Sequence, residues 1–135
     1  MNLEALAIGA NAPEEVNVVI DHLGHPDTAA GVQAPTFREL LALARCVRVH
    51  VRLSGFYHFC PDPYPFPSSW PLVRAVFDTF GGNRLLWGSD FPHCTVACGY
   101  GKSLHVLDEA LRDISLADRD AILGRGALSL YWPAS

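Results

Sequence analysis

Three short stretches of the chain carry the hydrophobic pattern of β-strands. Residues 16–20 (VNVVI) are rich in β-branched side chains without clean polar alternation, as in a strand buried on both faces of a parallel sheet. Residues 47–53 (VRVHVRL) alternate between apolar and polar positions, and residues 84–88 (RLLWG) form a shorter apolar run. The centres of these stretches lie 33 and 35 residues apart, and one β–α–β unit takes roughly 30 residues or more. The pattern therefore predicts two successive right-handed β–α–β units.

Between and after these strands, apolar residues recur at helical spacing. The predicted helices span residues 3–10, 35–45, 69–80, 102–113 and a segment that begins at Leu116. Pro35 suits the first turn of its helix, and Gly81 with Gly82 ends the next one. Ser115 and Asp118 are placed as an N-terminal cap pair. We therefore expect an α/β fold in which strands and helices alternate within one domain over residues 1–135.

Composition narrows the class of protein. Half of the 135 residues are hydrophobic and 18% are charged, below the roughly 25% usual for soluble domains, so more surface than normal needs covering. The net charge of −4 without a basic run argues against nucleic acid or an anionic membrane as the main partner. No apolar run reaches the length of a membrane span, and the first ten residues lack the basic start of a signal peptide. These features predict a cytoplasmic protein.

Polar side chains follow each predicted strand. They are His22 and His25, then Tyr57 and His58, then Asp90 and His93. In parallel α/β folds the carboxyl ends of the strands meet at one rim, where sites lie. A neutral imidazole and a carboxylate, such as His22 and Asp90, can ligate a divalent metal ion or act on a bound water. The same two residues are equally compatible with a structural pair or with caps of the following turns.

Several other residues have plainer explanations. His25 precedes Pro26 and is typical of an exposed loop residue, and His50 within a strand is typical of a packed or solvated imidazole. A stretch with four prolines, residues 61–67, is either a lid or a rigid connector. The cysteines are expected to be reduced thiols. An additional soft-ligand metal site is the less favoured alternative because the spacing of its members is irregular; they are His58, Cys60, His93, Cys94 and Cys98.

Two segments together resemble a known family. Residues 18–27 (VVIDHLGHPD) and 85–93 (LLWGSDFPH) are similar to the amidohydrolase-related family of TIM-barrel, metal-dependent hydrolases. Residues 51–57 (VRLSGFY) resemble its seventh strand, and residues 117–131 resemble its closing helices. The similarity is greatest to the lactonase branch, which includes pyrone-dicarboxylate lactonases and sugar-lactone hydrolases, and the resemblance covers nearly the whole chain.

The resemblance implies roles for the rim residues. His22 would end strand six and Asp90 strand eight of a (β/α)8 barrel. Asp90 would activate the hydrolytic water as general base, while His22 would bind the metal ion or polarise the substrate carbonyl. His25, Tyr57 and His93 would contact the small-molecule substrate. The implied cofactor is a divalent metal ion, zinc first, held by His22 and Asp90 only if further ligands complete the site; a metal-independent reaction is the alternative.

One departure from the family pattern is large. The family opens with a His-x-His pair at the end of strand one, and no His-x-His occurs in this sequence. A (β/α)8 barrel takes about 250 residues, so we expect the C-terminal part of the barrel, about strands six to eight. The expected function is that of a lactone hydrolase fragment; a decarboxylase of the same superfamily and an inert remnant are the alternatives. Unpaired strand edges and an uncovered inner barrel face predict self-association or a complementary N-terminal half as partner.

Overall fold

A computed structural model of the chain describes residues 11–13 and 15–133. Its centre is a three-stranded parallel sheet of β1 (Val18–Ile20), β2 (Val49–Leu53) and β3 (Leu85–Trp87), in that order across the sheet. Val51, in the middle of β2, lies opposite Ile20 on one side and Leu85 on the other. The predicted pair of β–α–β units is confirmed, with each strand shorter than the hydrophobic run that predicted it.

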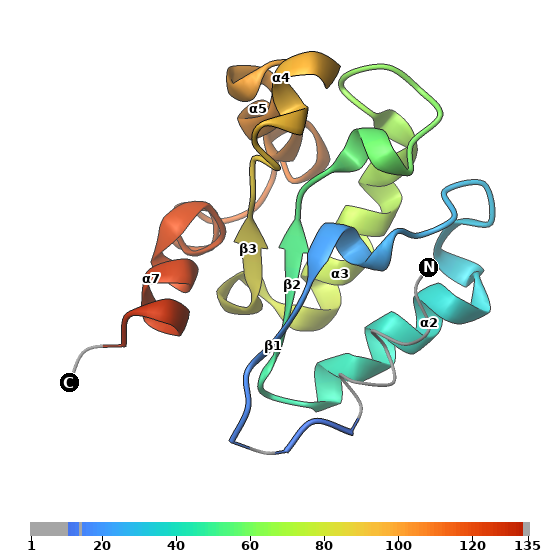
Figure 1. Ribbon diagram of the computed structural model, residues 1–135. Helices are drawn as coiled ribbons and strands as arrows, with labels where there is room; N and C mark the ends of the chain where they lie inside the picture. Colours follow the sequence, from blue (N-terminus) through green and yellow to red (C-terminus); the bar gives the residue numbers. More distant parts are fainter. Residues whose placement is uncertain (1–10, 14, 134–135) are drawn as a thin grey trace.

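The helices connect and cover these strands (Figure 1). They are α2 (Pro35–Ala42), α3 (Trp70–Phe80), α4 (His93–Ala97), α5 (Tyr100–Ala110), α6 (Leu116–Asp120) and α7 (Gly126–Tyr131). A 3-10 turn over Leu43–Arg45 extends α2 to the predicted end at residue 45. A π-helical turn over Ala121–Arg125 joins α6 to α7. The predicted helix over residues 3–10 lies outside the described residues.

The helix ends follow local chemistry. Pro35 occupies the first turn of α2, and Gly81, with a φ of 75°, directly follows the last residue of α3. The backbone N–H of Asp118 donates to the Ser115 hydroxyl over 3.0 Å, so the predicted cap pair is confirmed. Helix α4, which follows β3 directly after a short turn, is absent from the sequence prediction.

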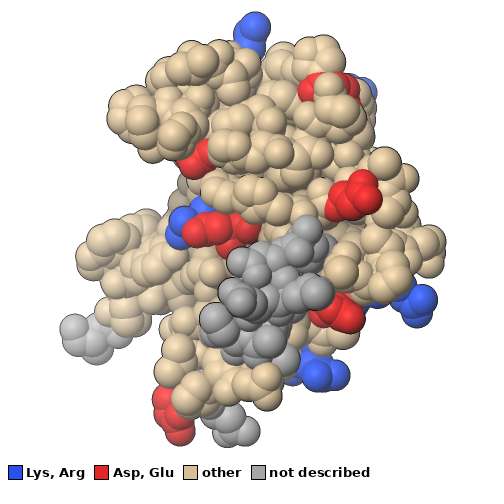
Figure 2. Space-filling model, turned by 45° about the vertical axis from the view of Figure 1, so that its right-hand side comes forward, with Lys and Arg blue, Asp and Glu red and all other residues tan. Residues whose placement is uncertain are grey.

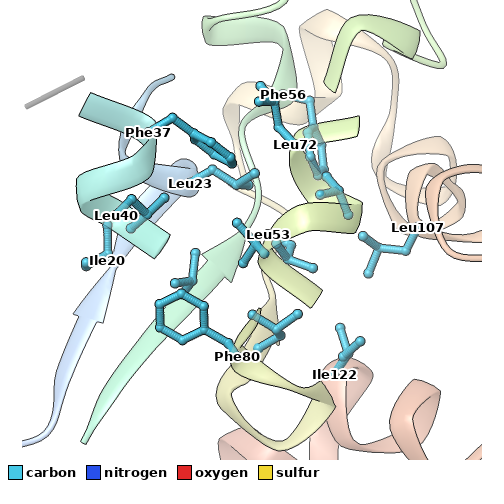
Figure 3. Close-up of a cluster of buried hydrophobic side chains, with 14 of the residues drawn as sticks. Ile20, Leu23, Phe37, Leu40, Leu53, Phe56, Leu72, Phe80, Leu107 and Ile122 are labelled. Carbon is cyan, nitrogen blue, oxygen red and sulfur yellow. The ribbon is translucent and has the colours of Figure 1, made fainter. Parts of the chain in front are cut away.

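The core lies between one face of the sheet and helices α2 and α3 (Figure 3). Along β2, Val49, Val51 and Leu53 are at most 2% exposed. They pack in one cluster with Phe37 and Leu40 of α2 and with Leu72, Val73 and Val76 of α3. Burying each such side chain contributes about 1.5–3 kcal/mol. This face therefore holds the strands in place.

The opposite face of the sheet is polar and hollowed. His50, Arg52 and Ser54 alternate with the core residues of β2, and Arg52 lies across Gly88, where a Cβ would approach the Arg52 Cδ to 2.8 Å. The Arg52 guanidinium pairs with Asp21 over 2.8 Å and donates to the Tyr131 hydroxyl over 2.9 Å. Tyr131, the last residue of helix α7, therefore contacts this face, and the expected partner that covers it stays a prediction.

Charged side chains are scattered over the molecular surface in the view of Figure 2, with acidic and basic groups interspersed. Among the described residues, no helix is both long and apolar enough to cross a membrane. All four cysteines are free thiols, with Cys94 fully buried in α4.

Candidate active site

His22 reaches the rim because the chain turns sharply after β1. His22 and Leu23 both have a φ of 52°, in the left-handed region that non-glycine residues seldom adopt. Leu23 is fully buried in the core and anchors the turn. Such backbone strain persists only where the surroundings enforce it, and it is concentrated at functional sites. The turn holds the imidazole of His22 at the carboxyl end of the sheet.

Two residues at the end of β2 hold the ring of His22. Its Nδ1 lies 2.8 Å from the hydroxyl oxygen of Ser54, a residue that is 1% exposed. Gly55, with a φ of 60°, packs directly against the ring, since a Cβ at this position would lie 2.6 Å from Nδ1. Glycine is therefore required here for both its backbone angle and its small size.

Asp90 follows β3 and is the centre of the polar cluster. Its Oδ2 accepts hydrogen bonds from the Tyr57 hydroxyl over 2.6 Å and from His58 Nε2 over 2.8 Å. An ionised carboxylate only accepts, so both partners donate. Its Oδ1 faces Nε2 of His22 at 3.9 Å, beyond hydrogen-bond distance. One oxygen is thus held by two donors, and the other is open toward His22.

These contacts shift the acidity of the cluster. Burial alone raises the pKa of Asp90, but the hydrogen bonds from Tyr57 and His58 and the neighbouring imidazoles outweigh it and leave the pKa below its usual value. Burial, together with the hydrogen bond to Asp90, holds the pKa of the Tyr57 phenol well above its usual range. Partial burial and the nearby His22 and His58 lower the pKa of His25. At neutral pH the cluster therefore contains an ionised Asp90 beside a protonated phenol.

The remaining predicted residues line the outside of this cluster. His25 is exposed, with its ring centroid 5.2 Å from that of His22 and 5.9 Å from that of His58. His93 is exposed at the start of α4, with its ring centroid 6.1 Å from that of His58. The structure thus brings all five predicted site residues to one rim.

Three further residues belong to the site. The sequence placed Arg52 on the polar side of the strand and Ser54 just after it, without a role for either, and placed His58 at the rim with a soft-ligand metal site as its one suggested role. A hollow of about 440 Å³ opens beside Ser54 and Arg52 and is also bordered by His22, Ser89 and Asp90. The polar alternation along residues 47–53 correctly placed Arg52 on this face, but it did not indicate a part in the site.

The donor set at the rim is too small for a metal ion. Within residues 11–13 and 15–133, no three His, Cys, Asp or Glu side chains are grouped so as to hold an ion. Catalytic zinc sites usually take three protein ligands and a water, and His22 with Asp90 offers two. The described residues therefore do not fit a complete metal site. The described residues also do not bring His58, His93 and the cysteines together as the alternative soft-ligand site.

Comparison with known proteins identifies the family. A family model described as amidohydrolase matches residues 3–131. The chain belongs to the amidohydrolase family. The predicted resemblance, including its lactonase-like character, is confirmed.

The relatives of this amidohydrolase chain include two lactone hydrolases. An L-fucono-1,5-lactonase of Burkholderia ambifaria is 36% identical over 103 residues, which cover 74% of this chain and 34% of that protein. A 4-sulfomuconolactone hydrolase of Rhizobium radiobacter is 36% identical over 88 residues, covering 65% of this chain and 28% of the relative. The matched part of the chain is therefore about a third of these relatives' length.

A solved structure shows the fold relationship. An amidohydrolase from Burkholderia multivorans with bound zinc superposes with a TM-score of 0.80 at 26% identity, over 96% of this chain and 48% of that one. The sheet and helices of this chain thus correspond to about half of an amidohydrolase TIM barrel. The predicted partial barrel is confirmed to that extent, and the numbering of its strands as six to eight stays a prediction.

Proposed function

We propose that this chain supplies part of the active site of a hydrolase that opens lactones by adding water to the ester carbonyl. In this proposal β1, β2 and β3 are strands six, seven and eight of a barrel, and residues 1–135 form one partial domain. The relatives that hydrolyse lactones support this reaction class. The observation that carries the proposal is the environment of Asp90, in which Oδ2 is held by two donors while Oδ1 stays open toward His22.

Asp90 acts as the general base. Its free Oδ1 accepts a proton from a water molecule, and the water oxygen forms a bond to the carbonyl carbon of the lactone. When the tetrahedral intermediate collapses, the bond between that carbon and the ring oxygen breaks. The proton on Asp90 then passes to the departing ring oxygen, so the product is an open-chain hydroxy acid and Asp90 is regenerated.

His22 stabilises the charge that develops on the carbonyl oxygen. Its Nε2 lies 3.9 Å from Oδ1 of Asp90, so a lactone carbonyl and its attacking water at the rim can meet the hydrogen-bond donor and the base side by side. A donor already fixed in place by Ser54 and Gly55 needs no reorientation during the reaction, and such preorganised groups typically lower the barrier by about 3–4 kcal/mol. Tyr57 and His58 hold the carboxylate, while His25 and His93 are placed to contact the substrate.

The proposal includes a partner for the sheet. β1 and β3 are its two edges, and parallel strands with open edges are normally paired or covered. We propose that further strands of an amidohydrolase barrel pair with these edges and contribute the rest of the site. The 135-residue chain by itself is then expected to show negligible lactone turnover.

A fusion tests this function. The chain is joined behind the N-terminal part of the Burkholderia ambifaria lactonase, in place of the segment that matches it, and assayed with L-fucono-1,5-lactone and a panel of other lactones. We expect turnover that Asp90→Asn lowers by a factor on the order of 10²–10⁴. Asp78→Asn, on an exposed carboxylate that pairs with Arg74 within α3, is the matched control and should leave turnover unchanged. A folded fusion without activity, or equal activity in the Asp90→Asn variant, would contradict the proposal.

A further inference from the structure

The hydrogen bond between Ser54 and His22 is buried. Ser54 is 1% exposed, and within the described residues its hydroxyl has one hydrogen-bond partner, Nδ1 of His22 at 2.8 Å. A serine hydroxyl has a single hydrogen to donate, while a neutral imidazole donates through one nitrogen and accepts through the other. The direction of this one hydrogen bond therefore determines which nitrogen of His22 carries the proton.

Two directions are possible, and they differ in what they leave unsatisfied. If Nδ1 of His22 donated, the hydroxyl hydrogen of Ser54 would be buried with no acceptor among the described residues. An unsatisfied buried donor costs about 1–3 kcal/mol. If Ser54 donates to Nδ1, both atoms are satisfied and the proton of His22 sits on Nε2. The second arrangement avoids this free-energy cost and is therefore favoured.

The other nitrogen of the ring gives an independent argument. Nε2 of His22 lies 3.9 Å from Oδ1 of Asp90, whose side chain is 15% exposed. An N–H directed at a carboxylate oxygen is attracted to it, whereas a ring lone pair directed at the same oxygen is repelled. Asp90 thus favours the proton on Nε2 as well. The ring has little freedom to turn away, because the backbone of Gly55 packs against it.

We propose that Ser54 is a positioning residue that holds His22 in the Nε2–H tautomer, as a hydrogen-bond donor at the rim. In this tautomer Nε2 carries a hydrogen and offers no lone pair to a metal ion. Of the two roles open to His22, metal ligand or polariser of the carbonyl, the hydrogen bond from Ser54 favours the second. The catalytic meaning of this tautomer rests on the proposed lactone hydrolysis, but the tautomer itself does not.

The chain contains internal references for measuring the tautomer. Nδ1 of His50 lies 3.1 Å from the backbone carbonyl oxygen of Arg48, and a carbonyl only accepts, so His50 is the Nδ1–H form. His58 donates from Nε2 to the Asp90 carboxylate and is the Nε2–H form. The two residues define both patterns of ring 15N chemical shifts within one spectrum.

Two-bond 1H–15N correlation spectra of the full chain at about pH 8, above the usual imidazole pKa of about 6.5, decide the question. His22 is assigned from the signals lost in His22→Gln. We expect its two ring nitrogens to show the pattern of His58 and the reverse of His50. A His22 that shows the pattern of His50 would overturn the proposal.

Variants of Ser54 test its role separately. In Ser54→Ala the two nitrogens of His22 are expected to move toward averaged shifts, while Ser54→Thr, which keeps the hydroxyl, retains the wild-type pattern. Unchanged His50 signals show that the fold persists in each variant. Wild-type shifts of His22 in Ser54→Ala would contradict the role of Ser54. Because the spectra need no turnover, absence of lactonase activity beside an Nε2–H tautomer would contradict the proposed function alone.

Discussion

The two faces of β2 differ in what holds them. On one face, Val49, Val51 and Leu53 are at most 2% exposed and pack against α2 and α3. On the other, Arg52 and Ser54 are held by a few directed hydrogen bonds to side chains from distant parts of the chain. The apolar face supplies the free energy that fixes the strand, and the polar face uses that fixed backbone to place chemical groups.

Substitutions at adjacent residues on the two faces should therefore differ most in how far they lower the free energy of unfolding. Leu53→Ala removes a fully buried side chain from the core, and we expect it to lower the free energy of unfolding by about 2–5 kcal/mol. Arg52→Ala removes a partly exposed ion pair with Asp21 and should cost roughly 1 kcal/mol or less. Urea denaturation followed by circular dichroism compares the two variants. Equal losses would show that the polar face is as important for folding as the apolar one.

A pair of glycines separates backbone strain from crowding at the site. Gly31 and Gly55 have φ values of 66° and 60°, but a Cβ meets nothing within 4 Å at Gly31 and lies 2.6 Å from His22 Nδ1 at Gly55. Alanine at either position costs about 1–2 kcal/mol for the left-handed backbone. Only Gly55→Ala should cost more than that and shift the ring signals of His22. If both variants behaved alike in stability and in the His22 spectrum, the close packing at Gly55 would be refuted.

A third comparison concerns a pH-dependent effect on the polar face. Tyr57→Phe removes a donor to Asp90 and should raise the pKa of that carboxyl toward its usual value. A lowered folded pKa stabilises the protein above the unfolded pKa of about 3.9 and ceases to do so as pH falls through the folded value. The variant should therefore be less stable by about 1–2 kcal/mol at neutral pH.

The stability difference between Tyr57→Phe and the unchanged protein should shrink as the pH falls below about 4. Unfolding measured between neutral pH and pH 3 checks the trend, with Tyr100→Phe, at a position that is 54% exposed, as the control that loses nothing. If Tyr57→Phe lowered the free energy of unfolding by the same amount down to pH 3, the stabilising effect of the Tyr57 hydroxyl would not depend on the ionised Asp90.

Periodicity along the chain predicts the apolar face well. The alternation over residues 47–53 and the helical spacing over residues 35–45 and 69–80 reflect burial, which the order of residue types records directly. Helix α4 escaped prediction because its five residues, HCTVA, are too few for a periodic pattern and include the β-branched Thr95 and Val96.

The polar face is predictable only in part. His22 and Asp90 were found because they follow strands and lie in segments that resemble the family. The role of Ser54 was missed because its partner His22 is 32 residues away, and that of His58 because Asp90 is 32 residues away. The left-handed φ at Leu23 was also hidden, because leucine does not mark such a turn.

The central claim, that Asp90 activates a water for attack on a lactone carbonyl, is tested most directly by oxygen labelling. The fusion with the lactonase N-terminal part is run in water enriched in 18O, and the hydroxy-acid product is analysed by mass spectrometry. We expect one 18O in the carboxylate of the product and loss of product formation in Asp90→Asn. Label in the hydroxyl group at the opened ring position, or labelled carboxylate formed equally fast by Asp90→Asn, would contradict the account.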